Sequence, residues 1–214
     1  YLLDSLARDK KDVDFGMHIL PHAIANDNTF AYPFYGYWRD VGTIQAYWEA
    51  NMDIIKKESG ISPEKWRIRT NFEAEGRAAD RPPVRFGAEA QVQTSLISSG
   101  CTIQGTVINS VLSPGVVVEK GAIIRNSILF SDCIVKKKAV IDLAIFDKQV
   151  EVGEGAHIGV SEDHDIPNRQ HPKHLYTGIT LVGKGVGVPA GVNVGRNCVI
   201  DSYCRRESFR QKKI

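Results

Sequence analysis

The chain has 214 residues and a formal net charge of +2, with 43% hydrophobic and 24% charged residues. These fractions are typical of a globular protein with one or two domains. The small net charge argues against a nucleic-acid platform, and no apolar run approaches the ~20 residues that cross a bilayer, which argues against a membrane protein.

The N-terminal third mixes short helical signals with one aromatic stretch. Asp14 is a candidate cap for a short helix that closes at Pro21, and Thr29–Tyr37 has the aromatic content of a strand. Thr43 is a candidate N-cap for a second helix that ends near Gly60. Its apolar positions have helical spacing and predict a core-facing side: Ile44, Tyr47, Trp48, Met52 and Ile55.

Asp40 is the acidic residue that stands out in this third, between aromatic residues and Gly42 and just before the second helix. Two readings remain open from spacing. A lone Asp at a turn is commonly hydrogen-bonded to the local backbone. It also suits Mg²⁺, which one or two carboxylates usually hold together with substrate phosphates.

The segment 61–83 contains Pro63, Pro82 and Pro83 and has no hydrophobic period, which predicts a linker. We therefore expect a first domain at 1–60, a linker at 61–83 and a second domain at 84–214.

A period of six organises the second domain. An apolar residue returns at each sixth position, with a second, small or aliphatic residue four places later and Gly or Ser often before it. The first positions are Ile97, Ile103, Leu112, Val118, Ile124, Phe130, Phe146, Val152, Ile158, Val182, Val188, Val194 and Ile200. The second positions include Cys101, Val107, Val116, Ala122, Ile128, Ile134, Val150, Ala156, Val186, Val192 and Cys198.

This period predicts a parallel β-helix over residues 84–200, of roughly five to six coils with three hexads each. A helix cannot use a period of six, because its apolar stripe would rotate around the axis. A β-sandwich of short strands is the alternative. The phase slips after Ile103 and after Phe130, which suggests bulged corners, and Ser161–Thr177 lacks the period and predicts a loop.

Four cysteines (Cys101, Cys133, Cys198 and Cys204) form no C-x-x-C pair, and at least two fall on inward positions. We expect reduced thiols and a cytoplasmic setting. The chain begins with Tyr1 and not with Met, so we expect it to be part of a longer protein.

Several motifs together resemble the glucose-1-phosphate adenylyltransferases, the ADP-glucose pyrophosphorylases. They are G-Y-W-R-D-V-G-T-I at 36–44, A-Y-W-E-A-N at 46–51, D-F-G at 14–16, N-S-V-L-S-P-G at 109–115 and A-I-F-D-K at 144–148. The resemblance covers nearly the whole chain and corresponds to the C-terminal half of the enzyme. It implies a left-handed parallel β-helix preceded by a small α/β remnant of a nucleotidyltransferase domain.

The resemblance also implies a reaction: ATP and glucose 1-phosphate give ADP-glucose and pyrophosphate for glycogen or starch synthesis, with Mg²⁺ held in part by the aspartate that matches Asp40. The family's Gly-rich nucleotide loop, its second metal aspartate and its sugar-phosphate lysine have no counterpart here. No catalytic set is therefore complete in this chain, and we expect it to be inactive alone.

The resemblance further implies allosteric control and tetramers. Lys148 matches a basic residue of the family's effector site, so we expect it to bind an anionic effector, a phosphorylated sugar or a nucleotide. Lys136, Lys137 and Lys138 are expected to add to a cationic patch around it.

Other functions remain open. Hexad repeats also occur in acyltransferases, for which His157, His164, His171 and His174 are candidate bases, and in other sugar-1-phosphate nucleotidyltransferases. A third possibility is a purely regulatory and oligomerisation module.

Overall fold

The computed structural model describes residues 14–56, 59–66, 81–161 and 166–210. It divides into two compact units, Tyr1–Gly36 and Tyr37–Ile214, and each is described by itself. Among the helices of the described residues, none has the length and apolar character needed to span a bilayer.

The first unit contains a short π-helix, η1 (Phe15–Ile19), continued by α2 (Leu20–Asn26). Asp14 caps η1, since its carboxylate accepts a hydrogen bond from the Met17 amide over 2.6 Å. Pro21 does not close the helix as predicted. It lies in the first turn of α2, where its missing N–H removes no obligatory bond.

The structure contains no strand at residues 29–37, so the strand predicted there is wrong. Its aromatic side chains are largely exposed, with Phe30 and Tyr32 each 89% accessible and Tyr35 93% accessible.

The second unit begins with the segment that leads into α3 (Ile44–Ile55), and the short α4 (Pro63–Trp66) follows it. Thr43 is the N-cap of α3, as predicted, and accepts a hydrogen bond from the Ala46 amide over 3.0 Å. The helix ends at Ile55, earlier than the predicted Gly60, because Lys56 is already extended.

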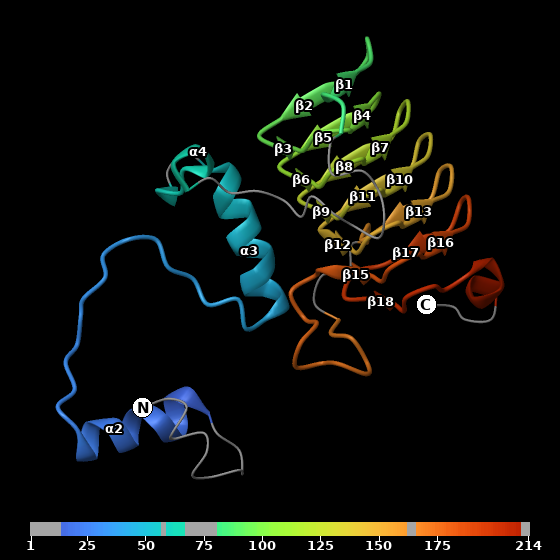
Figure 1. Cartoon of the computed structure of the whole chain (residues 1–214). Coiled ribbons are helices and arrows are strands. Elements are labelled where there is room, and N and C mark those ends of the chain that lie inside the picture. The colour runs from blue at the N-terminus through green and yellow to red at the C-terminus, as the bar shows by residue number, and fades with distance from the viewer. Residues whose placement is uncertain (1–13, 57–58, 67–80, 162–165, 211–214) are drawn as a thin grey trace. The chain divides into compact units, whose positions relative to one another are not determined.

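The hexads form a parallel β-helix, as predicted (Figure 1). Within the described residues, eighteen short strands build three six-stranded parallel sheets. Sheet A contains β1 (Arg85–Phe86), β4 (Thr102–Ile103), β7 (Val117–Val118), β10 (Ile134–Val135), β13 (Glu151–Val152) and β16 (Gly187–Val188). Sheet B contains β2 (Gln91–Gln93), β5 (Thr106–Ile108), β8 (Ile123–Arg125), β11 (Val140–Asp142), β14 (His157–Ile158) and β17 (Asn193–Val194). Sheet C contains β3 (Leu96–Ile97), β6 (Val111–Leu112), β9 (Ile128–Leu129), β12 (Ala144–Phe146), β15 (Thr180–Val182) and β18 (Val199–Ile200).

The register explains the phase slips. Val117 pairs with Ile134 and Ile134 with Glu151, so a middle coil takes 17 residues and not three full hexads. The missing residue is at the corner between sheets B and C, where Asn126 has a positive φ of 50°. After that corner Leu129 is inward and fully buried.

Three of the predicted inward positions are therefore wrong. Ile128, Phe130 and Ile134 each lie one residue beyond the true inward positions, which belong to Ser127, Leu129 and Cys133. The prediction assumed six residues between successive inward positions, whereas the corner between sheets B and C has five, from Ile124 to Leu129.

A ladder of buried serines lies inside the β-helix along sheet C. The Ser110 hydroxyl accepts from the Ser127 amide over 3.1 Å and donates to the Ile108 carbonyl over 2.7 Å. The Ser127 hydroxyl accepts from the Ala144 amide over 3.1 Å and donates to the Arg125 carbonyl over 2.6 Å. Both side chains are fully buried, and their polar atoms are satisfied from coil to coil.

The end of the predicted linker is fixed to a corner of the β-helix. The Arg81 guanidinium contacts both carboxylate oxygens of Asp132, at 2.7 and 3.1 Å. Gly115 has a positive φ of 79°, and the Arg81 guanidinium occupies the place that a Cβ would take there. Glycine at this position thus allows both the corner and the ion pair.

The predicted loop separates β14 from β15, and its described residues contain no strand (Figure 1). Asn197 holds it: its side chain accepts from the Gly178 amide over 2.7 Å and donates to the Ile166 carbonyl over 2.9 Å. Leu175 is buried and anchors the loop's C-terminal part. A 3₁₀ turn, η3 (Arg206–Arg210), follows the last coil.

Candidate functional site

The segment that carries Asp40 is tied to α3 on both sides. Before Asp40, the Tyr37 hydroxyl donates to the Asp53 carboxylate over 3.0 Å, and the Arg39 guanidinium lies 3.1 Å from the same carboxylate oxygen. After it, Thr43 caps the first turn of α3. Three residues, 40–42, span the two attachments, so the position of Asp40 is set by the helix.

Asp40 itself is exposed, and among the described residues its carboxylate accepts no hydrogen bond. The carboxylate leans towards Gly42, where an added Cβ would be 3.3 Å from Oδ2. A hydrogen-bonded turn residue would use this carboxylate on the local backbone, and that does not happen here.

The described residues contain no group of three or more His, Cys, Asp or Glu side chains able to hold a metal. Asp40 therefore fits a magnesium site only as one ligand, with the others coming from substrate phosphates, water and side chains outside the described part of the chain. One carboxylate with phosphate oxygens is an ordinary Mg²⁺ arrangement.

Charges around Arg39 strengthen the attachment to α3. Arg39 also forms a close ion pair with Glu49, and Gln45 donates to Glu49 over 2.8 Å. The hydrogen bond from Gln45 lowers the pKa of Glu49, and the hydrogen bond from Arg39 lowers it further. Burial and the hydrogen bond to Asp53 raise the pKa of Tyr37, so its hydroxyl stays a donor at neutral pH.

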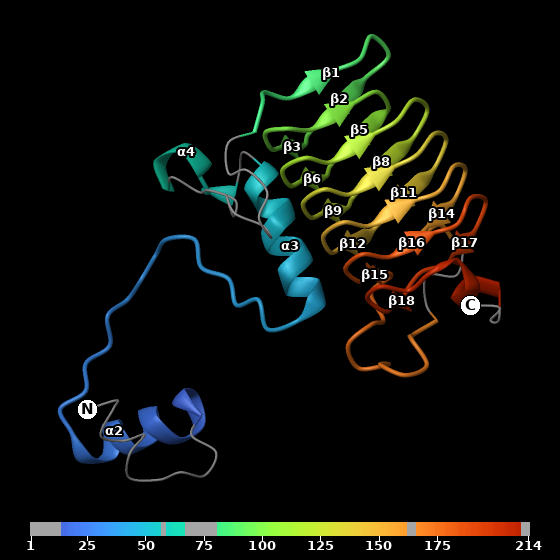
Figure 2. The ribbon, with the colours of Figure 1, turned by 45° about the vertical axis from the view of Figure 1, so that its right-hand side comes forward.

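The opposite side of α3 packs on the outer face of sheet C (Figure 2). Met52 is 1% exposed and contacts Val111 and Ile128. The Tyr47 ring meets Phe130 edge-on, with 6.4 Å between the ring centroids. The aromatic residues of α3 are thus part of a core, as predicted from their spacing.

Sheet C presents an apolar residue outward on every strand, which sheets A and B do not. This outer stripe of sheet C consists of Leu96, Val111, Ile128, Ile145, Leu181 and Val199. The corresponding positions of sheet A include Arg85 and Glu151, and those of sheet B include Gln91 and Asn193. Only the middle of the stripe is covered by α3.

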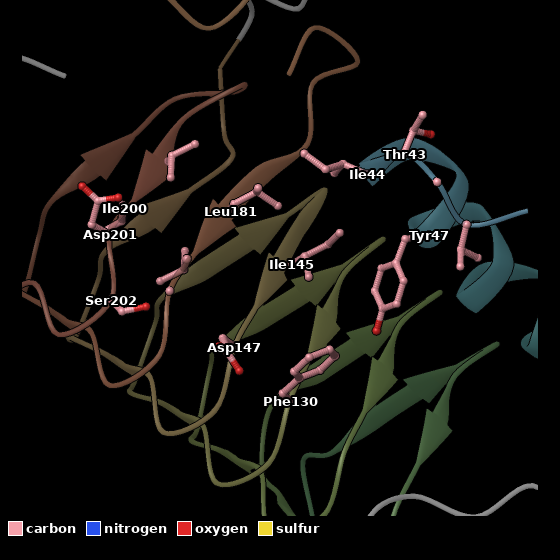
Figure 3. A pocket seen from close by; sticks show the side chains of 15 residues that line it. Thr43, Ile44, Tyr47, Phe130, Ile145, Asp147, Leu181, Ile200, Asp201 and Ser202 are labelled. Carbon is pink, nitrogen blue, oxygen red and sulfur yellow. The ribbon is translucent and has the colours of Figure 1, made fainter. Parts of the chain in front are cut away.

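The uncovered end of the stripe is the floor of an open groove of about 740 Å³ beside the first turn of α3 (Figure 3). Ile145, Leu181 and Phe130 lie along the floor, and Thr43, Ile44 and Tyr47 form the helical wall. Asp147, Asp201 and Ser202 lie at the opposite rim. The groove therefore connects the segment after Asp40 with a corner of the last coils.

Lys148 lies at that corner, between sheets C and A, and is partly buried. Its carbonyl accepts from the Gly185 amide over 2.9 Å, which places Lys184 at the same corner one coil further. This pairing was not predicted, because the loop separates the two lysines along the chain. A signal was present in the sequence, since each lysine lies two positions after an apolar residue of a hexad, Phe146 or Val182.

Lys136, Lys137 and Lys138 lie at a different corner, between sheets A and B. Lys136 forms a close ion pair with Glu151. The expected patch of these three lysines around Lys148 is therefore not formed.

The candidate acyltransferase histidines are dispersed. His157 points outward from β14 on sheet B, and His171 and His174 are exposed on the loop, while His164 lies outside the described residues.

Two protein-family models match the chain. The model for GlmU-like C-terminal hexapeptide proteins matches residues 82–182, and the model for nucleotidyl transferases matches residues 1–57. Both matches agree with the architecture, a hexapeptide β-helix preceded by nucleotidyltransferase sequence.

Curated relatives give a more specific comparison. A glucose-1-phosphate adenylyltransferase from Acetivibrio thermocellus is 40% identical over 218 residues, covering 100% of this chain and 49% of the relative. The enzyme of the same name from Thermomicrobium roseum is 42% identical over 97% of this chain and 49% of its own length. That from Clostridioides difficile is 46% identical over 56% of this chain and 31% of its own.

The chain thus combines a hexapeptide-repeat β-helix with a preceding segment that is similar to nucleotidyl transferases. It is similar along its whole length to the C-terminal half of glucose-1-phosphate adenylyltransferases, and it spans about half the length of the curated relatives it matches.

Proposed function

We propose that this chain is the C-terminal part of an enzyme that makes ADP-glucose and pyrophosphate from ATP and glucose 1-phosphate. The observation that carries the proposal is the exposed carboxylate of Asp40 on a segment that is fixed to α3. Its carboxylate has no hydrogen-bond partner among the described residues, and its segment is fixed to α3 at Tyr37, Arg39 and Thr43. The names of the relatives support the choice of substrates.

In the proposed reaction, a phosphate oxygen of glucose 1-phosphate attacks the α-phosphorus of ATP, and the bond to pyrophosphate breaks. Mg²⁺ neutralises charge on the phosphates when it is bound. Asp40 supplies one carboxylate ligand, and α3 holds that carboxylate in place against the β-helix. The described residues contribute no nucleotide loop, so the ATP site is expected to come from the half of the relatives that this chain does not match.

The test is a fusion enzyme, in which the N-terminal half of the Acetivibrio thermocellus relative is joined to this chain at Tyr1. We expect the fusion to form ADP-glucose from ATP and glucose 1-phosphate, while the 214-residue chain alone forms none. A soluble, folded fusion that forms no ADP-glucose would contradict the proposal.

We further propose that Lys148, together with Lys184, binds an anionic effector, a sugar phosphate or a nucleotide. The two ammonium groups belong to one corner in successive coils, which are about 4.8 Å apart. Phosphate favours such pairs, because each hydrogen bond between charged groups contributes about 1.5–3 kcal/mol.

The measurement is activation of the fusion against concentration, with glucose 6-phosphate and AMP as probes. Lys148→Ala and Lys184→Ala should each raise the half-activating concentration about tenfold for the probe that activates. Lys120→Ala, at an exposed lysine on another corner, is the matched control. If the activation curves of all three variants were the same, the proposed role of Lys148 in effector binding would be wrong.

The enzyme is proposed to be a homo-oligomer, and the uncovered end of the outer stripe of sheet C is the candidate contact. Apolar residues in one continuous row on a surface commonly mark an interface, and the middle of this row is already covered by α3. Leu181→Asp should lower the molecular mass seen by light scattering at tens of micromolar. Thr106→Asp, outward on sheet B, should not, and a wild-type monomer at that concentration would contradict the proposal for this chain.

A further inference from the structure

We infer that Asp53 is the positioning residue for Asp40: through Tyr37 and Arg39 it holds the segment that presents the Asp40 carboxylate. The inference rests on the proposed role of Asp40 as a magnesium ligand and adds the residue that fixes it. Asp53 lies thirteen positions further along the chain, and no sequence motif singled it out.

Asp53 is a buried carboxylate, 9% exposed, on the third turn of α3. Burial of an ionised carboxylate is costly unless donors surround it. Three donors do so here: the Tyr37 hydroxyl at 3.0 Å, the Arg39 guanidinium at 3.1 Å and the Lys56 ammonium at 3.4 Å.

The donors differ in what they hold. Lys56 is local, since it is three residues from Asp53 at the end of the same helix. Tyr37 and Arg39 belong to the extended segment before Asp40, and the same carboxylate oxygen, Oδ2, receives both of them. This single oxygen therefore fixes both the third residue before Asp40 and the residue directly before it.

Asp53 is itself held firmly, because its neighbour Met52 is 1% exposed between α3 and sheet C. Glu49, one turn earlier, adds a second contact to Arg39. The segment that carries Asp40 is thus bonded to α3, and α3 is packed on sheet C of the β-helix. Loss of Asp53 should release Tyr37 and half of the Arg39 contact without disturbing the packed side of α3.

The first experiment uses the 214-residue chain and needs no activity. Trypsin cleaves after Arg39, and cleavage of the Arg39–Asp40 bond is followed by mass spectrometry. Asp53→Asn should raise the rate of this cleavage at least threefold, because the freed segment enters the protease more readily. The rate should stay at the wild-type value in Glu154→Gln, an exposed acid on the β-helix.

The second experiment uses the fusion enzyme and separates positioning from a structural role. Asp53→Asn should raise the half-saturating Mg²⁺ concentration about tenfold while kcat at saturating Mg²⁺ falls less than threefold. Asp53→Glu, which keeps the charge, should recover part of the Mg²⁺ affinity. A matched melting temperature for Asp53→Asn and wild type is expected, since the interface with sheet C is untouched.

The outcomes distinguish the inference from the proposed function. Faster cleavage with an unchanged Mg²⁺ curve would make Asp53 structural and overturn the inference, and an unchanged cleavage rate would overturn it directly. A wild-type fusion that makes no ADP-glucose would contradict the proposed function, while the cleavage experiment would still report whether Asp53 holds the segment.

Discussion

The indole N–H of Trp48 donates to the carbonyl of Asn126 over 2.8 Å, and this hydrogen bond joins α3 to a corner of the β-helix. Asn126 is also the corner residue whose positive φ shortens the coil, and its side chain donates to Asp142 over 2.9 Å. The same corner therefore sets the register of sheet C and anchors the helix that precedes the linker.

Trp48→Phe should loosen α3 without emptying its interface, because the phenyl ring keeps part of the apolar contact while the N–H donor is lost. A net loss of about 1 kcal/mol is expected, or roughly fivefold faster hydrogen exchange of the α3 amides. Trp38→Phe, at a side chain that is 76% exposed, is the control and should change nothing. Equal exchange in both variants would show that packing alone holds the helix.

Ser127→Ala should destabilise the β-helix by about 1–3 kcal/mol, because the Ala144 amide and the Arg125 carbonyl would lose a buried partner. The measurement is urea unfolding followed by circular dichroism. Ser113→Ala, at a partly exposed serine, should have little effect. The ladder would be unimportant for stability if the two variants unfolded together.

Gly115→Ala should cost at least about 1 kcal/mol from its positive φ alone, and more because the Arg81 guanidinium fills the space of the new methyl group. Combining it with Arg81→Ala should cost less than the sum of the two single changes, since each removes the same ion pair. Gly187→Ala, where nothing lies within 4 Å of an added Cβ, is the control for thermal unfolding. Strict additivity of the first pair would contradict the shared contact.

Burial raises the pKa of the Cys133 thiol to about 12 from an ordinary value of 9.0. The folded state therefore keeps a proton that the unfolded chain releases above pH 9, so stability from this thiol is constant below pH 9 and declines between pH 9 and 12. At pH 10.5, about 1.5 units above 9.0, this loss of folding stability amounts to about 2 kcal/mol. Cys133→Ala should remove that part of the decline. Unfolding at pH 8 and pH 10.5 measures it, and an equal decline in both proteins would contradict the assignment.

The sequence predicted the parts of this structure that repeat. In-phase hexads predicted the β-helix, its span and the loop before Thr180, because a buried aliphatic residue at each sixth position is a strong periodic signal. Thr43 and the apolar side of α3 were also predicted, since capping and helical spacing are local.

Contacts between distant segments were not predicted. Phe130 was assigned inward because a five-residue corner at Asn126 cannot be seen in a six-residue period. Lys148 was grouped with Lys136 by distance along the chain, whereas the coils place it beside Lys184. No local sequence pattern marks Asp53, since its partners Tyr37 and Arg39 contact it only after their segment folds back on α3.

The boundaries expected at residues 60 and 83 stay a prediction. The expected strand at 29–37 failed for a physical reason, since aromatic content favours a strand only where a neighbouring strand completes its hydrogen bonds, and the described residues offer none there.

The most direct test of the account is pyrophosphate release by the fusion enzyme with and without Asp40→Asn, at saturating ATP, glucose 1-phosphate and Mg²⁺. Asp40→Asn should lower kcat at least a hundredfold, because a carboxylate ligand placed at the phosphates contributes several kcal/mol to the transition state, and its melting temperature should be unchanged. Asp27→Asn, at an exposed aspartate outside the motif, should keep full activity. Turnover by Asp40→Asn equal to that of the unmodified fusion would reduce Asp40 to a surface residue and contradict the account.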